Sequence, residues 1–277
     1  MVASTTSVPY TPRMIGLLRR LVLFAVLWPA LLRGQSAQGA GTSPAVAIVD
    51  HAALDALLRA YVRDGLVNYD AFAAAPAFRD YLASLDRVQP ALLEEQERLA
   101  FWLNVYNAFT IQLIVSHGER ASIRNINRTL GVLQLKGPWS EPIVRAAGRW
   151  LTLDEVAYRI IRKEFADPRV YAAMTPAARG GPPLRSEAYT GAQLDAQLED
   201  QMRRFLGNWR HNRFRAGVAS LSPVILNHRQ DFGGSRKELG AFLAEYFSGE
   251  DRRRLQSGEF VVRANRFDWA LNAQSRR

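Results

Sequence analysis

Three side chains near the C-terminal end of the sequence could form a catalytic relay. Ser222, His228 and Asp231 lie within ten residues of one another. A hydroxyl, an imidazole and a carboxylate can serve as the nucleophile, the general base and the group that orients the base. Because a relay is defined by its geometry and not by its spacing, these residues support a thiol-independent hydrolase as the alternative to a binding function.

Several other chemistries are excluded by what the 277-residue chain lacks. It contains no cysteine, so it can form neither a thiolate nucleophile nor a disulfide nor a cysteine metal site. The sequence has no HExxH zinc motif, no phosphate-binding loop and no dinucleotide fingerprint. We therefore expect no metal and no cofactor, and whether the protein is an enzyme stays open.

Two carboxamides interrupt the most apolar part of the sequence. The segment from about Leu92 to His117 is expected to form one helix, and it is apolar almost all round, which is typical of a helix buried on every side. Asn104 and Asn107 lie three residues apart on one of its faces. A buried amide without partners costs about 1 to 3 kcal/mol, so each needs a specific partner. The two amides either hold the backbone of a neighbouring loop or line a polar cleft and orient a ligand.

Shorter helices and a few strands are expected around this central helix. Capping boxes are predicted at Thr152–Glu155, Thr190–Gln193 and Ser235–Glu238, because each pairs a hydroxyl with a carboxylate or amide three residues later. Strands are predicted at 143–145, 149–151, 218–221 and 259–263, the first two as a hairpin. The pattern predicts an α+β fold that is mainly α-helical, with a few short strands around the buried central helix.

Residues 1–40 differ in composition from the rest of the chain. Arginines precede the apolar run Leu21–Leu32, and the small residues Ala37 and Gly39 follow it. A spanning helix needs about 20 apolar residues, so this shorter run is typical of a cleaved signal peptide. We expect residues 1–40 to be an export segment, residues 41–277 to be a single globular domain, and the protein to be periplasmic or secreted. The alternative is an uncleaved N-terminal anchor.

The chain is basic, with 36 Lys and Arg against 26 Asp and Glu. Four of the arginines belong to residues 1–40, and others are concentrated between Arg203 and Arg215, where Phe205, Trp209 and Phe214 lie among them. Such a segment could bind nucleic acid, but export makes that partner unexpected, and none is predicted. The segment is then either a solvated helix end and loop or a contact for an anionic surface of the cell envelope.

Large aromatic side chains offer another type of binding surface. A groove for a sugar or a peptide could be lined by Trp102, Trp139, Trp269, Tyr106, Tyr189 and Phe232. Large aromatic residues more commonly fill the hydrophobic core. Both uses stay open for these six residues.

The central helix carries a motif that resembles a known family. Phe101–Ala108 reads FWLNVYNA and is similar to the FWxNxYNA signature of the domain of unknown function 547 family. Gly65–Tyr69, Asp231–Gly234 and Phe267–Asn272 are similar to further landmarks of the family in the same order. The resemblance covers roughly residues 50–272. It implies no reaction, because the family is named for lacking an assigned function, and it implies export as a frequent property of the bacterial members.

The chain departs from the family pattern in the segment 170–184. The resemblance implies one histidine and two cysteines there, whereas this sequence has Tyr171, Pro176 and Gly181 at those positions. Proline and glycine offer neither a nucleophile nor a metal ligand. If the family uses these residues for thiol chemistry, this protein has lost it; if they only pack, the loop keeps its role.

These observations favour an exported domain that acts by binding. We expect a cleft between the central helix and the loop Met174–Arg185, in which Arg179 and Arg185 contact an anionic group while the two asparagines hold the loop. Asp231 is counted among the ligand-binding residues. The expected partner is an unknown small molecule or a component of the cell envelope, and the oligomeric state does not follow from the sequence.

Overall fold

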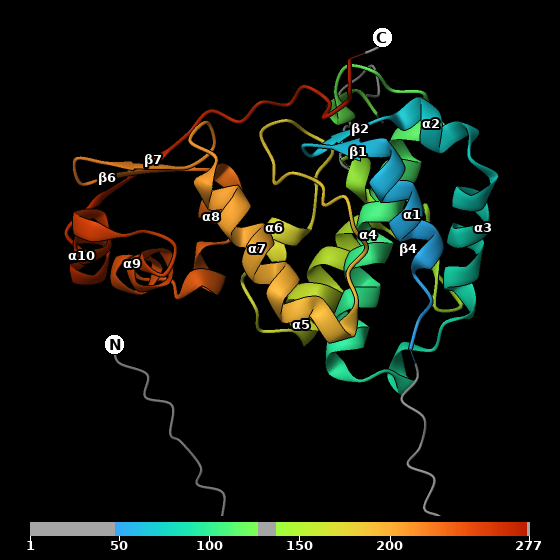
Figure 1. Cartoon of the computed structure of the whole chain (residues 1–277), viewed down its shortest axis with the longest axis horizontal. Helices are drawn as coiled ribbons and strands as arrows, with labels where there is room; N and C mark the ends of the chain where they lie inside the picture. The colour runs from blue at the N-terminus through green and yellow to red at the C-terminus, as the bar shows by residue number, and fades with distance from the viewer. Residues whose placement is uncertain (1–47, 127–136, 276–277) are drawn as a thin grey trace, which may run out of the picture. The chain divides into compact units, whose positions relative to one another are not determined.

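Helix α4 (Glu95–His117) lies at the centre of the structure, a computed structural model that describes residues 48–126 and 137–275 (Figure 1). Acidic residues in its first turn and His117 in its last turn complement the helix dipole. Gly118 ends the helix in the left-handed conformation with a φ of 57°. The predicted central helix is confirmed, although it begins later than expected because Pro90–Leu92 forms a separate 3-10 turn.

Helix α4 has the length and composition of a membrane-spanning helix, but most of it is buried inside the structure. By length and composition it could cross a membrane, and it is the one such helix within the described ranges. However, 83% of its most apolar window is buried inside the structure. Asn104 and Asn107 are buried with the apolar residues around them.

The N-terminal part of the chain covers one side of α4. Its elements are α1 (Ala52–Tyr61), β1 (Val62–Arg63), β2 (Leu66–Val67), α2 (Tyr69–Ala74) and α3 (Pro76–Ser84). Helix α2 packs on α4, and α1 packs on α3. The Asn68 side chain caps α2 by accepting from Ala71 N–H at 3.0 Å. Pro76 begins α3 at a position that needs no N–H donor.

The middle of the chain contains the predicted hairpin and several short helical segments. Its elements are β3 (Val144–Ala146), β4 (Arg149–Leu151), a π-helical segment at Glu155–Ile161, α5 (Arg162–Glu164) and α6 (Val170–Ala173). Strand β3 pairs with β4 in the antiparallel sense, as predicted. The π-helical segment packs on α4. In the predicted capping box at its start, Glu155 N–H donates to Thr152 Oγ1 and Thr152 N–H donates to Glu155 Oε2, both at 3.0 Å.

The C-terminal part adds a three-stranded sheet and further helices. Its elements are α7 (Leu194–Gly207), β5 (Arg213–Arg215), β6 (Val218–Leu221), α8 (Pro223–Asn227), α9 (Arg236–Ala244), α10 (Gly249–Ser257) and β7 (Val261–Ala264). Strand β6 pairs antiparallel with β5 and parallel with β7. After β7 the chain returns to the N-terminal hairpin, where Val67 pairs with Ala273 (Figure 1).

Two of the three predicted capping boxes are present, and the third is wrong. Ser235 and Glu238 form the box that opens α9. At Thr190, however, the N–H donates to Gln197 Oε1 at 3.1 Å, and the residues before α7 form a 3-10 turn. Gln197 takes the place of Gln193 because its amide also donates to the Ala188 carbonyl at 2.8 Å, so that one side chain satisfies two backbone groups.

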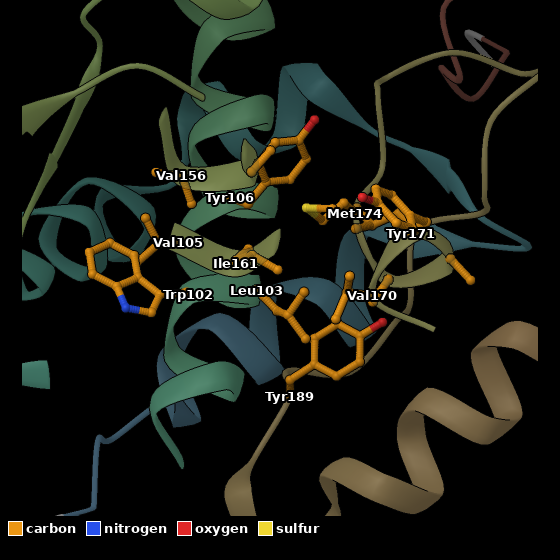
Figure 2. Packing of buried hydrophobic residues seen from close by; sticks show 14 of the residues in the cluster. Trp102, Leu103, Val105, Tyr106, Val156, Ile161, Val170, Tyr171, Met174 and Tyr189 are labelled. Atoms are coloured by element: carbon orange, nitrogen blue, oxygen red, sulfur yellow. The ribbon is translucent and has the colours of Figure 1, made fainter. Parts of the chain in front are cut away.

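One hydrophobic core surrounds α4, and all the residues that the structure describes belong to one compact unit. Figure 2 shows side chains of α4 packed with those of the π-helical segment and of α6. Further 3-10 turns lie at Leu85–Arg87, Ile123–Asn125, Pro138–Ser140 and Arg229–Phe232. The predicted fold class, α+β and mainly helical with a few short strands, is confirmed.

Candidate functional site

The two asparagines of α4 hold both ends of one loop. Asn104 Nδ2 donates to the Tyr189 carbonyl at 2.7 Å, and Tyr189 N–H donates back to Asn104 Oδ1 at 2.9 Å. Asn107 Nδ2 donates to the Ala173 carbonyl at 2.8 Å, and Thr175 N–H donates to Asn107 Oδ1 at 3.0 Å. Both amides therefore act as backbone ties, which is the first of the two hypotheses for these residues.

Arg185 faces protein carboxylates. Its guanidinium pairs with Glu187 at 2.9 Å and with Asp200 at 2.5 Å, and its side chain is only 10% exposed. The space that it lines together with Asn104 and Asn107 measures only about 10 Å³. The ligand cleft expected at these three residues is therefore filled by packing, and the cation expected to bind an anionic ligand is already neutralised.

Arg179 lines a different cavity from Arg185. Its backbone N–H donates to the Ala270 carbonyl at 2.8 Å, and its Nε donates to the Leu271 carbonyl at 3.3 Å. It lines a space of about 510 Å³ together with Arg210 and residues of the segment 178–183. The structure thus does not bring the two predicted anion-binding arginines to one site.

Ser222, His228 and Asp231 do not form the alternative catalytic relay. Ser222 is buried, and its Oγ accepts from Val224 N–H at 3.3 Å as the N-cap of α8. Asp231 accepts two bonds from Arg162, at 2.8 and 3.1 Å. In the described part of the chain, no hydrogen bond joins the side chain of His228 to that of Ser222 or Asp231, although the Asp231 backbone N–H donates to the His228 carbonyl at 2.9 Å. The three groups are close in sequence, but each has another structural partner.

Tyr171 connects two of these residues in another way. Its hydroxyl donates to Asp231, and its ring stacks on His228 with centroids 4.0 Å apart and an interplanar angle of 10°. Burial favours a higher pKa for Asp231, but hydrogen bonds from Arg162 and Tyr171 and the charge of Arg162 hold that pKa below its usual value. Burial lowers the pKa of His228, so its ring is neutral at about pH 7.

An open cavity of about 230 Å³ lies beside α4, and we call it the aromatic pocket. It shares Tyr106 of the central helix and Met174 and Pro176 of the loop with the predicted cleft, but none of the predicted ligand-binding residues lines it. Figure 2 shows Tyr106 of α4 with Met174 and Tyr171 beside it. The pocket is lined by Tyr106, Trp139, Asp154, Ala157, Tyr158, Tyr171, Met174, Pro176, Pro223, Val224, Asn227, His228, Phe267 and Trp269.

A few polar groups stand among the aromatic walls. The Asp154 carboxylate accepts from Ser140 Oγ at 2.5 Å. The indole Nε1 of Trp139 is buried and has no hydrogen-bond partner among the residues with described positions. A pocket with apolar walls and a small number of polar groups is the usual form of a small-molecule site.

The π-helical segment contributes Ala157 and Tyr158 to the pocket wall, and Asp154 directly precedes it. A π-helical turn widens the helix and is frequent at functional sites. In this protein the π-helical segment forms part of the wall of the aromatic pocket. The sequence carries a signal for the start of the segment, in the capping box, but none for the π-helical turn itself.

Sequence reasoning identified only part of this site. Of the six aromatic residues considered for a groove, Tyr106, Trp139 and Trp269 line the pocket, whereas the other three are buried in the core. Tyr158 belongs to no motif. Asp154 lies within the predicted capping box and Phe267 within a segment similar to a family landmark, but neither was predicted to belong to a site. Tyr171 was noted only because it stands at the position of the family's histidine.

Residues 90–206 match the model of the family described as "Protein of unknown function, DUF547". The match covers less than half of the chain, and over these residues the chain is similar to the DUF547 family. No curated protein and no solved structure matches the chain. The DUF547 match contains α4, the π-helical segment, α6 and Pro176, whereas the pocket walls from α8 and from Phe267 and Trp269 lie beyond it.

Two positions at which this chain departs from the expected family pattern lie at the aromatic pocket. Tyr171 and Pro176 both line it. Gly181 does not, but it lies against Pro176. Within residues 48–126 and 137–275, no group of three or more His, Cys, Asp or Glu residues could hold a metal ion.

Proposed function

We propose that this protein is a ligand-binding domain and that the aromatic pocket holds a small organic molecule. The observation that carries the proposal is the pocket itself, about 230 Å³ with six aromatic side chains and a few polar groups among them. Aromatic walls bury a ligand's apolar face, while the isolated polar groups orient it. Tyr171 and Pro176, the positions at which the family resemblance implies a histidine and a first cysteine, also line this space, which is a second reason for the proposal.

The walls of the pocket are held in place before any ligand binds. Tyr171 is stacked on His228 and donates to Asp231, which Arg162 holds with two hydrogen bonds. Asn107 ties the backbone on both sides of Met174. A pre-ordered site loses less side-chain freedom on binding, which favours affinity. Asp231 thereby supports the pocket without lining it.

Filling the pocket tests this function. Val224 lines the cavity and is only partly buried, so Val224→Phe should occupy part of the space without disturbing the core. A fragment library of small neutral and charged compounds would be screened by the change in tryptophan fluorescence, which Trp139 and Trp269 in the wall should report. Compounds that bind the wild type should lose about tenfold or more in affinity with Val224→Phe.

Val261→Phe is the matched control, because Val261 is 54% exposed on β7 and does not line the pocket. It should leave every affinity unchanged. Ligands that bind Val224→Phe as tightly as the wild type would place the binding site elsewhere and refute the proposal.

Export belongs to the proposed function and rests on residues 1–40, which lie outside the described residues. The chain would be produced in a bacterium with its own N-terminus, the cell fractions separated, and the N-terminal residue of the product determined. A mature chain that begins near Ala40, found in the periplasm or the medium, is the expected result. An intact chain in the membrane fraction would instead support the N-terminal anchor.

A further inference from the structure

We propose that the aromatic pocket selects a small organic cation, an amine or a quaternary ammonium compound, held between aromatic faces and the Asp154 carboxylate. This inference rests on the proposed function, because it names the chemical class of ligand for the same pocket. It depends on two observations, the composition of the walls and the charge of the one ionisable carboxylate among them.

The walls offer several aromatic faces to a cation. Six of the lining residues are Tyr, Trp or Phe, and they come from five separate segments of the chain. A cation near an aromatic face is attracted by the negative charge of the ring face, most strongly when water is excluded. One wall residue already takes part in such an interaction, because the guanidinium carbon of Arg124 lies 5.2 Å from the Trp269 ring centroid.

The charge of the lining residues is negative. Among the lining residues with described positions, Asp154 is the only Asp, Glu, Lys or Arg, although the chain as a whole is strongly basic. His228 also lines the pocket, but burial lowers its pKa and leaves the ring neutral at about pH 7. Arg162 lies near the wall through its contact with Asp231, and its charge is matched by that carboxylate.

The Asp154 carboxylate has no positive partner in the described part of the chain, where its one hydrogen bond comes from Ser140 Oγ. The negative charge of Asp154 acts on two tyrosines of the pocket wall. Burial raises the pKa of Tyr158, and the negative charge of Asp154 raises it further; both causes act on Tyr106 in the same way. A carboxylate without a countercharge, beside several ring faces, is suited to a cation and repels an anion.

Matched pairs of probes test the charge directly. Choline and 3,3-dimethylbutan-1-ol have nearly the same shape, but only choline is charged, and benzylamine and benzyl alcohol form a second such pair. Affinities would be measured by calorimetry with the full chain. The cation of at least one pair should bind about tenfold or more tightly than its neutral counterpart.

Variants assign this preference to the pocket. Asp154→Asn keeps an acceptor for Ser140 but removes the charge, so it should lower the affinity for the cation about tenfold and leave the neutral compound unchanged. Tyr158→Leu, at a residue that is 46% exposed, should weaken the cation more than the neutral compound. The control is Asp80→Asn, because Asp80 is exposed on α3 and does not line the pocket. Melting curves would confirm that each variant is folded.

The outcomes separate this inference from the proposed function. Equal affinity for both members of each pair, or tighter binding of the neutral ones, overturns the cation inference. The cation inference is also overturned if only uncharged compounds outside these pairs bind and lose affinity with Val224→Phe. In both cases the proposed function stands. If no compound of any charge binds in a manner sensitive to Val224→Phe, the proposed function fails and the cation inference fails with it.

Discussion

Gly181 lies directly against the ring of Pro176. A Cβ placed on Gly181 would be 2.6 Å from Pro176 Cδ and closer still to Cγ. These are the two positions at which the family resemblance implies cysteines. In this chain the proline ring fills the space beside residue 181, so that only glycine fits there.

Gly181→Ala should therefore destabilise the protein by about 1 to 3 kcal/mol, because the added methyl group overpacks the contact with Pro176. Pro176→Ala/Gly181→Ala should recover a large part of this loss, which a double-mutant cycle of urea denaturation would measure. Gly207→Ala is the control, since nothing lies within 4 Å of a Cβ at that position. Additive effects of the two substitutions would contradict the contact.

Asn107→Leu should lower the free energy of unfolding by about 2 to 4 kcal/mol, because it leaves Thr175 N–H and the Ala173 carbonyl without their partner. Asn104→Leu should act in the same way at Tyr189. Gln112→Leu is the control on the same helix, where the amide makes an exposed bond to Ser116. Denaturation curves for Asn107→Leu that coincide with those of the wild type would show that the tie carries no stability.

Tyr171→Phe should raise the pKa of Asp231, since it removes a hydrogen bond that favours the ionised carboxylate. A titration of the Asp231 carboxyl carbon by NMR would measure the shift. Because the pKa of Asp231 is lowered in the folded state, its contribution to stability is present at neutral pH and is lost as the pH falls through the folded-state pKa. The variant should therefore lose less stability in acid, and an unchanged carboxyl titration would refute the role of Tyr171.

His51 should make the stability depend on pH. It is 4% exposed, its Nδ1 is 2.8 Å from the Tyr81 hydroxyl, and burial lowers its pKa from 6.5 to about 4. The unfolded chain binds the proton more tightly than the folded protein does. The contribution of the neutral His51 ring to the free energy of unfolding is therefore complete above about pH 6.5 and is lost as the pH falls toward 4.

We expect His51 to account for a loss of up to about 3 kcal/mol in the free energy of unfolding between about pH 6.5 and 4. Urea denaturation across the pH range would compare the wild type with His51→Gln, which does not titrate. The difference between the two profiles should grow as the pH falls. Parallel profiles would mean that His51 is not held neutral in the folded protein.

The sequence by itself determined the local structure and the requirement that two buried amides have hydrogen-bond partners. Helix α4, the β3–β4 hairpin and the capping boxes at Thr152 and Ser235 were predictable, because periodic apolar residues and short-range hydrogen bonds are encoded within a few positions. The same reasoning required partners for Asn104 and Asn107, since a buried amide cannot be left unpaired.

Only the tertiary structure decided which residues meet. Tyr106 and Trp269 line one cavity although more than half of the chain separates them, whereas Trp102, on the same helix as Tyr106, is buried in the core. Arg185 was predicted to bind an anion, but the fold supplies Glu187 and Asp200 as its partners. Side-chain identity sets what a residue can do, but packing between distant segments sets whether it faces a ligand, a countercharge or the core, and that information is not local in the chain.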